Sequence, residues 1–239
     1  MFDHLTIRAS DGDASEQFYD TVLAVLGLEQ DRPGRLEWGD FSLREATPDD
    51  PVTRRLHVAF RAGSRELVDE FWGVGTEAGH TSGGEPGPRP EYMPDYYGAF
   101  LLDPDGNSVE AVIHEIPRDA ATIDHLWIRV GDLEAARRFY ETLAPWTGFE
   151  ARGSGRFGAG FAGSAGSFML VPGRPTENVH VAFPAFDNAA VEAFHRAALD
   201  AGYRDNGPPG ERPIYHPGYY AAFVLDPDGN NIELVNHNR

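Results

Sequence analysis

Two imidazoles and one carboxylate occur twice in this chain at matching positions. The two sets are His4, His57 and Glu110, and His125, His180 and Glu233. Both sets are intact although neighbouring residues differ between the copies. Two neutral imidazoles and one carboxylate, with other coordination positions open, form the facial triad that suits ferrous iron and also manganese, nickel or zinc. The sequence therefore predicts a divalent metal in at least one half, with Fe²⁺ as the first choice and Mn²⁺, Ni²⁺ or Zn²⁺ as alternatives.

The triads repeat because the whole chain repeats. The segment DHLTIR near the start returns as DHLWIR, and AFLLDPDGNSVE returns as AFVLDPDGNNIE. A weaker repeat lies inside each copy, since His4 and Phe18 recur 53 residues later as His57 and Phe71. Four related modules of mixed α and β character favour paired globular domains over an open array.

Each copy is long enough to bury a core of its own. We predict one domain over residues 1–116 and a second over 122–239, each closing its own sheet around its own triad. The segment from Glu115 to Thr122, which contains Pro117, is the predicted linker.

Strand alternation determines which face the triad side chains occupy. Leu5 and Ile7 alternate with polar neighbours, the period of a half-buried strand. Because a predicted helix covers the apolar face, His4 lies on the opposite face. The same reasoning places His57 and Glu110 on the face away from the helices. Each module reads as strand, helix and two strands, with a third strand trailing, which is an α+β pattern.

The remaining repeated and unrepeated histidines suit other roles. His114 and His237 lie four residues beyond the glutamates on the same strand face. Four strand residues span roughly 13 Å, which is too far for a shared metal. His80 and His195 are not repeated, so we assign them to a helix surface or to the core.

His216 is a candidate catalytic residue of the second half. It lies in a proline-stiffened loop that leads into the strand before Glu233, where its side chain would overhang the metal. The first half has Met93 at the matching position. Ordinary loop packing is the alternative role for His216.

Composition limits the classes of partner. The formal net charge is −18, and all 20 basic residues are arginine. Such a chain is repelled by nucleic acid and by anionic membrane surfaces. There is no cysteine and no apolar stretch of membrane-spanning length, so we expect a soluble, cytoplasmic protein. The expected partner is a small-molecule substrate. The expected oligomeric state is a monomer or a homodimer.

With these motifs in place, the chain resembles the vicinal oxygen chelate superfamily, which includes glyoxalase I, type I extradiol dioxygenases, and fosfomycin- and bleomycin-resistance proteins. The resemblance implies an α+β fold of four βαβββ modules forming two eight-stranded, cup-shaped sheets around a metal. In that pattern the ligands come from the first strand of each module and the last strand of the pair. Those positions hold the six repeated residues named above.

The second half is similar to the extradiol signature. His216, the run Asp226 to Gly229 and Glu233 match its spacing, with Phe223 in place of a tyrosine and Ala222 in place of a larger apolar residue. The resemblance implies a ring-cleaving dioxygenase that acts on an oxygen-chelating substrate, with His125, His180 and Glu233 on the metal and His216 as acid or base. The implied substrate-pocket residues are Tyr219, Tyr220, Phe223 and Arg212, with Tyr96, Tyr97 and Arg89 as their first-half counterparts.

Two alternatives follow from the same resemblance. A glyoxalase-like isomerase or lyase would use His4, His57 and Glu110 with Glu45 as a fourth ligand. The second half offers only the apolar run 170–172 at that position. A ligand-sequestering resistance protein would use the cup without chemistry, but its bleomycin-type members need no metal ligands, so the intact triads argue against that version.

Overall fold

A computed structural model describes residues 2–32, 34–116 and 121–238. The elements of the first half are β1 (His4–Ala9), α1 (Gly12–Val25), β2 (Glu37–Trp38), β3 (Phe41–Glu45), β4 (His57–Arg61), α2 (Arg65–Glu77), β5 (Thr81–Pro88), β6 (Tyr97–Leu102) and β7 (Ser108–Ile113). Those of the second half are β8 (Ile123–Val130), α3 (Leu133–Thr147), β9 (Glu150–Ser154), β10 (Ala159–Ala162), β11 (Ser167–Pro172), β12 (His180–Pro184), α4 (Asn188–Asp200), β13 (Arg204–Glu211), β14 (Tyr220–Leu225) and β15 (Asn231–Asn236). The predicted α+β class is confirmed.

The two sheets each combine strands from both halves of the chain. The first sheet has seven described strands in the order β13-β14-β15-β12-β1-β3-β2, and the second has eight in the order β5-β6-β7-β4-β8-β11-β10-β9. The first module therefore joins the fourth through β1 and β12, and the second joins the third through β4 and β8. The expectation that residues 1–116 and 122–239 each close their own sheet is wrong in this respect.

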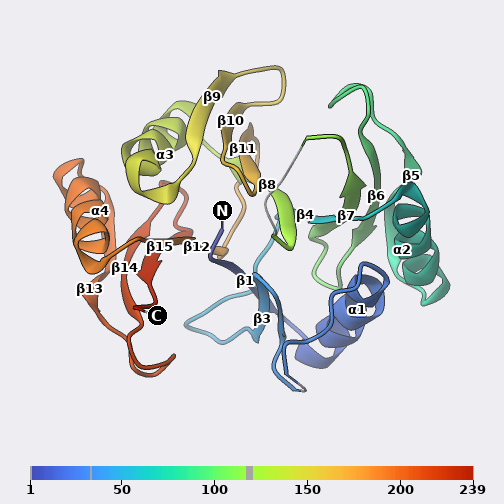
Figure 1. Ribbon diagram of the computed structural model, residues 1–239, viewed down its shortest axis with the longest axis horizontal. Coiled ribbons are helices and arrows are strands. Elements are labelled where there is room, and N and C mark those ends of the chain that lie inside the picture. The colour runs from blue at the N-terminus through green and yellow to red at the C-terminus, as the bar shows by residue number, and fades with distance from the viewer. Residues whose placement is uncertain (1, 33, 117–120, 239) are drawn as a thin grey trace.

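The physical reason for the crossing lies in the helices. Within each half, α1 packs on α2 and α3 packs on α4, so the two modules of one half meet through their helical layers. Figure 1 shows α1 with α2 on one side of the molecule and α3 with α4 on the other, with the sheets between them. Strands β1 and β4 would each have an unpaired edge within their own half. Strands β12 and β8 of the other half pair with these edges. The central part of the predicted linker, residues 117–120, lies outside the described residues.

Short sequence signals hold these elements in register. Asp11, Ser64, Asp132 and Asp187 each accept a backbone N–H at a helix N-terminus. The predicted tight turn before β15 forms, with Asp226 Oδ1 accepting the N–H groups of Asp228 and Asn230. These turns lead β7 and β15 into the middle of their sheets, where the triad glutamates lie.

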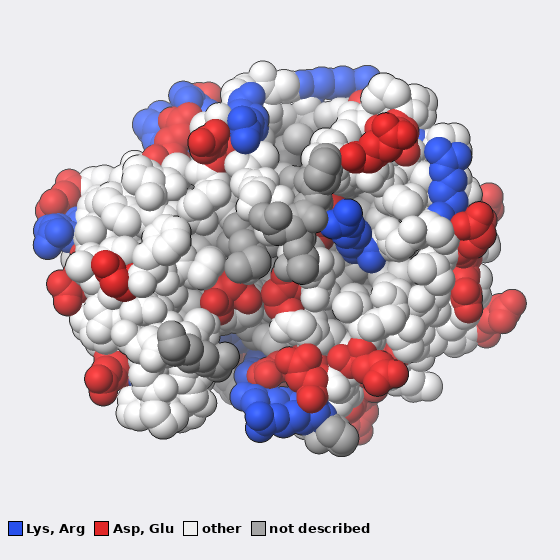
Figure 2. All heavy atoms as spheres, viewed as in Figure 1, with Lys and Arg blue, Asp and Glu red and all other residues white. Residues whose placement is uncertain are grey.

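The surface carries mixed charge, as the composition implies. Figure 2 shows arginine and acidic side chains interspersed over one face. None of the helices among the described residues is long and apolar enough to cross a membrane.

Candidate metal centres

The six predicted ligands gather into two groups, but not in the groups that the sequence halves suggest. The first centre consists of His4, His180 and Glu233, and the second consists of His57, Glu110 and His125. Within each group the donor atoms lie within 4.8 Å of one another. Each centre therefore takes one histidine from one half and a histidine and glutamate from the other. The grouping by halves is wrong because the sheets cross.

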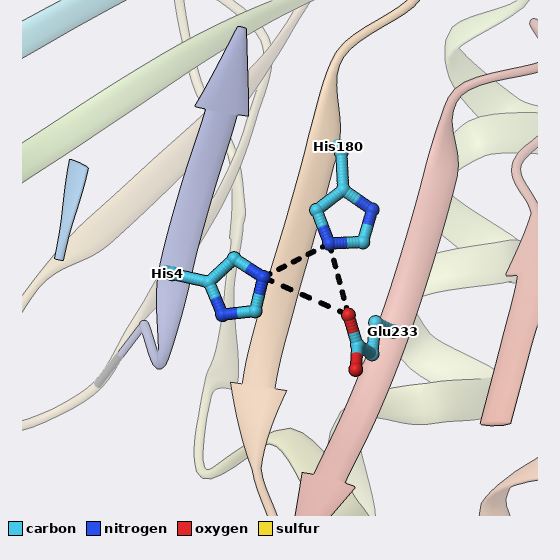
Figure 3. Close-up of side chains that lie close together, drawn as sticks. All are labelled: His4, His180 and Glu233. Atoms are coloured by element: carbon cyan, nitrogen blue, oxygen red, sulfur yellow. Dashed lines mark hydrogen bonds and ion pairs between the residues drawn. The ribbon is translucent and has the colours of Figure 1, made fainter. Parts of the chain in front are cut away.

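The register of three neighbouring strands builds the first centre. His4 on β1 lies opposite Ala182 on β12, and Ala182 lies opposite Glu233 on β15. His180 lies two residues before Ala182 and so shares its face. The small, fully buried Ala182 leaves space above the sheet in which the three larger side chains converge, as Figure 3 shows.

The donor atoms of the first centre point at one another. His180 Nε2 lies 2.9 Å from Glu233 Oε2 and 3.1 Å from His4 Nε2, while His4 Nε2 lies 3.7 Å from Glu233 Oε2 (Figure 3). On the far side of each ring, Asp3 Oδ1 accepts from His4 Nδ1 at 2.8 Å, and the Asn231 amide lies 2.7 Å from His180 Nδ1.

This arrangement fits a divalent cation. Asp3 is an acceptor only, so the His4 hydrogen lies on Nδ1 and the Nε2 lone pair faces the centre. The Asn231 amide nitrogen faces His180 Nδ1, so a neutral His180 carries its hydrogen on Nε2, toward Glu233. Binding of a cation at His180 Nε2 would require this hydrogen to leave Nε2 and the Asn231 amide to turn its oxygen toward Nδ1. Two imidazole lone pairs would then face a carboxylate oxygen at close range, which a cation stabilises.

The second centre has the same construction from different strands. His57 Nε2 and His125 Nε2 lie 3.1 and 3.5 Å from Glu110 Oε2. Asp124 Oδ1 accepts from His125 Nδ1 at 2.9 Å, and the Ser108 hydroxyl lies 3.0 Å from His57 Nδ1.

The electrostatics of the two centres differ by residue. Burial lowers the pKa of both His57 and His180. For His125 burial acts in the same direction, but the hydrogen bonds to Asp124 and Glu110 outweigh it and raise the pKa to about 9. The pKa of His4 is also raised, because the effects of Asp3 and Glu233 together exceed the opposing effect of burial.

Tyr219 and Tyr96, predicted as pocket walls, line the cavities at the centres and also hold the triad glutamates. Each phenol donates a 2.6 Å hydrogen bond to the Oε1 atom of its glutamate, Glu233 or Glu110. Burial and the neighbouring carboxylate raise both tyrosine pKa values far above the usual range. The phenols therefore remain donors and leave Oε2 turned toward the histidines.

Tyr220 and Tyr97 face away from the centres, in contrast to the prediction. Their hydroxyls donate to Glu192 on α4 and Asp69 on α2. Successive strand residues point to opposite faces, so Tyr220 cannot share the concave face with Tyr219. Neither Tyr220 nor Tyr97 is among the residues that line the cavities at the centres.

The predicted pocket arginines pack over aromatic rings. Arg212 lies 5.5 Å from the ring centroid of Phe223, and Arg89 lies 5.6 Å from that of Phe100. Both guanidinium groups also donate to backbone carbonyls of their own loops. Phe223 and Arg89 line the cavities described below, and Arg212 is not among the residues that line them.

His216 joins the first centre through a chain of hydrogen bonds. Its Nε2 lies 2.8 Å from His237 Nδ1, and His237 Nε2 lies 2.9 Å from Asp3 Oδ2. Asp3 in turn contacts the ligand His4. The other ring nitrogen of His216 donates to the Pro217 carbonyl at 2.8 Å. His216 thus lines the cavity of the first centre, and His237 and Asp3 lie between it and the ligand His4.

The second centre has a shortened version of the same chain. His114 Nε2 lies 3.1 Å from Asp124, but His114 Nδ1 has no hydrogen-bond partner among the described residues. Met93 takes the place of His216 there. His114 and His237 therefore contact the aspartates rather than a shared metal position, in agreement with their strand spacing.

The other proposed ligand and the unrepeated histidines lie elsewhere. Glu45 ends β3 opposite Ala9 and is exposed, so it does not face either centre. His80 packs edge-on against Phe18, and buried His195 contacts Asp205.

The sequence reasoning missed two pairs of residues that shape the centres. Asp3 and Asp124 orient one histidine ring in each, and Ala182 and Ala59 leave the space for the ligands. The signal was present in the repeated dipeptide DH and the repeated tetrapeptide HVAF.

Cavities open over both centres. The cavity at the first centre measures about 410 Å³ and has a polar wall that includes Thr6, Ser42 and Arg44. The second centre lies between cavities of about 250 and 350 Å³, which share Tyr92, Tyr96 and Trp127. Volumes of this order suit small molecules.

Comparisons with known proteins agree with this architecture. Glyoxalase I from Zea mays has 20% identity to this chain and a TM-score of 0.67, with 99% of this chain and 92% of that chain covered. A Bacillus subtilis protein named provisionally as a dioxygenase has 15% identity and a TM-score of 0.67, with coverage of 100% and 85%. At these identities the likeness concerns the fold alone. A search of curated proteins found no match.

A family model identifies the second half directly. The model for the Glyoxalase/Bleomycin resistance protein/Dioxygenase superfamily matches residues 122–234. The first half repeats the segments that carry both triad histidines and the glutamate. The second half of the chain therefore matches the glyoxalase, bleomycin resistance protein and dioxygenase superfamily, and the first half repeats its triad segments within the same fold.

Proposed function

We propose that this protein is a metal-dependent enzyme with dioxygenase-type chemistry, and that the first centre acts on a small, polar, oxygen-chelating substrate. One observation carries the proposal: His4, His180 and Glu233 present two imidazoles and one carboxylate, with no fourth carboxylate of the described residues free to join them. This donor set with open positions is typical of non-haem ferrous oxygenases.

The glyoxalase-like alternative lacks its fourth ligand at this centre. The β3 residues on the ligand face are Ser42 and Arg44, since these lie opposite Thr6 and Arg8 of β1. Glu37 lines the cavity, but its two oxygens pair with Arg35 and Arg44 at 3.0 Å each. A carboxylate held in this way is poorly placed as ligand or base.

The cavity wall offers polar groups of both charges to a substrate. Arg8, Arg35 and Arg44 all line it, together with the hydroxyls of Thr6 and Ser42. Each arginine pairs with a carboxylate, Arg8 with Asp50 at 2.7 Å and the other two with Glu37 at 3.0 Å. Guanidinium groups recognise carboxylates through paired hydrogen bonds, so an acid group of the substrate would exchange with one of these partners.

His216 and His237 form a hydrogen-bonded pair of rings in the wall of the first cavity. His216 Nδ1 faces a carbonyl and His237 Nε2 faces a carboxylate, so both of those nitrogens carry hydrogen. The remaining nitrogens lie 2.8 Å apart and need one further hydrogen between them. One hydrogen between them would link His216 through His237 to Asp3, and the proposal assigns proton exchange with the substrate to His216.

A ferrous ion bound by the triad would supply the open positions at which substrate oxygens and dioxygen exchange charge. Residues of the chain would position the ligands and cover the cavity. Tyr219 fixes the Glu233 carboxylate, Asp3 fixes the His4 ring, and Phe223 covers one side of the cavity.

The test is oxygen uptake by Fe²⁺-loaded protein over a panel of catechols, carboxylated catechols and 2-hydroxy acids. We expect uptake with an acidic member of the panel, loss in His4→Ala, and retention in the matched variant His125→Ala. Turnover of a hemithioacetal without oxygen uptake would instead support the glyoxalase-like alternative. No uptake with any member of the panel would contradict the proposal.

His216→Ala should lower kcat about 10²- to 10⁴-fold, the usual effect of removing a general acid or base. The metal content should not change, because His216 is not a ligand. Met93→Ala is the matched control in the other sheet and should leave kcat unaltered. An unchanged kcat in His216→Ala would assign the residue to loop packing.

A further inference from the structure

The two centres share a scaffold and a ligand set, but their walls differ in a consistent way. Trp127 at the second centre takes the place of Thr6 at the first, and Met169 takes the place of Ser42 across the strand pair. Met93 replaces His216. At each of these three positions a polar side chain becomes a large apolar one.

The substitutions create an aromatic wall, which consists of Tyr92, Trp127 and Phe157. Their ring centroids lie 5.5 to 5.8 Å apart, with Tyr92 edge-on to both other rings. The wall lines the 250 Å³ cavity, to which Met93 and Met169 add thioether surface. A flat apolar ring fits such a surface, and a small hydrated anion does not.

Positive charge lies at the opposite end of the second centre. The 350 Å³ cavity is lined by Arg89 and Arg129 together with His57 and Glu110 of the triad. Arg129 is exposed and has no ion-pair partner shown among the described residues. Tyr92, Tyr96 and Trp127 line both cavities, so one ligand can reach from the aromatic wall to the arginines.

We propose that the second centre is a separate binding site for an aromatic carboxylate. The ring lies against Trp127 and Tyr92, and the carboxylate points to Arg129. The first centre prefers smaller aliphatic acids because its wall is polar. The two centres have thus diverged in ligand class while they keep the same set of ligand types.

The experiment compares two probes that share a carboxylate and an adjacent hydroxyl. Salicylate carries them on an aromatic ring, and glycolate carries them on a single carbon. Calorimetric titrations use chelator-treated protein, so the outcome does not depend on the metal proposed above. We expect salicylate to bind with one equivalent per chain and at least tenfold more tightly than glycolate.

Trp127→Thr gives the second centre the residue of the first and should weaken salicylate binding about tenfold, with glycolate unchanged. Thr6→Val is the matched control and should leave salicylate binding unaltered. If circular dichroism shows that Trp127→Thr is unfolded, Phe157→Ala and Arg129→Gln replace it, since Phe157 lies outside the strands and Arg129 is exposed. Salicylate affinity that is unchanged in the folded variants, or that falls in Thr6→Val instead, would overturn the proposal.

Discussion

Each candidate centre depends on residues that do not touch the metal position. Asp3 and Asp124 set the ring orientation of one histidine in each, and Tyr219 and Tyr96 set the orientation of the glutamates. Partners of this kind raise ligand basicity and fix the tautomer. Each of these contacts lies within one half of the chain, but the two contacts that serve one centre come from different halves.

Paired substitutions test how the ligands are grouped. His4→Ala/His180→Ala removes two ligands from one centre, so one metal equivalent should remain. His4→Ala/His57→Ala removes one ligand from each centre, so both should lose metal. Metal analysis of the purified variants, with circular dichroism to confirm folding, measures this. The reverse pattern would restore the grouping by sequence halves.

At the scale of elements, strand register brings the ligands together. Ala182 and Ala59 each lie between a histidine strand and a glutamate strand, in equivalent rows of the two sheets. Both are fully buried on the concave face. Their small size is a requirement of the centre rather than of the core, which lies on the other side of the sheet.

Ala182→Val should block the first centre while the strand persists, because valine suits a strand but its added methyl groups enter the space between the ligands. Metal content should fall by one equivalent, with little change in circular dichroism. Ala59→Val should do the same at the second centre. Full metal content in Ala182→Val would mean that the centre has more room than the register implies.

The turn before β15 gives a pH dependence. Burial raises the pKa of Asp226 from 3.8 to about 6, so the folded chain binds this proton more tightly than the unfolded chain does. The stabilisation is present below pH 4 and is lost as the pH rises to 6. Relative to Asp226→Asn, the wild-type free energy of unfolding should fall by up to about 3 kcal/mol across this window.

Urea unfolding of both proteins at several pH values measures this difference. The comparison with Asp226→Asn is needed because other carboxyls, such as Asp3, have lowered pKa values and change stability in the opposite direction. A difference that stays constant between pH 4 and 7 would contradict a raised pKa for Asp226.

At the scale of the whole molecule, each half provides strands that pair with edge strands of the other half. The pairings of β1 with β12 and of β4 with β8 join the halves at the middle of both sheets. Neither half contains a complete centre. A complete ligand set at either position therefore requires both copies of the repeat.

Separately expressed chains 1–116 and 122–239 should each fail to bind a divalent metal tightly, since each carries an incomplete set at either centre. Mixing them should restore about two equivalents per pair. Metal titration followed by gel filtration measures both steps. A full metal equivalent on the isolated first chain would show that His4, His57 and Glu110 can form a centre by themselves.

The sequence alone determined the candidate ligand types and the local structure. The repeated His, His and Glu residues identified all six candidate ligands, and alternation along β1 predicted the face on which His4 lies. The run Asp226 to Gly229 predicted the turn before β15. Each of these follows from residues close together in the chain, where periodicity and turn preferences act directly.

Only the tertiary structure decided which ligands meet. The four modules have similar strands, so the sequence pattern of an edge strand does not specify which other strand pairs with it. The packing of α1 on α2 places β1 and β4 in different sheets, and the other half completes both. The same contacts turned Tyr220 toward α4 and linked His216 to His4 through His237 and Asp3. These outcomes depend on long-range packing, which local sequence patterns do not encode.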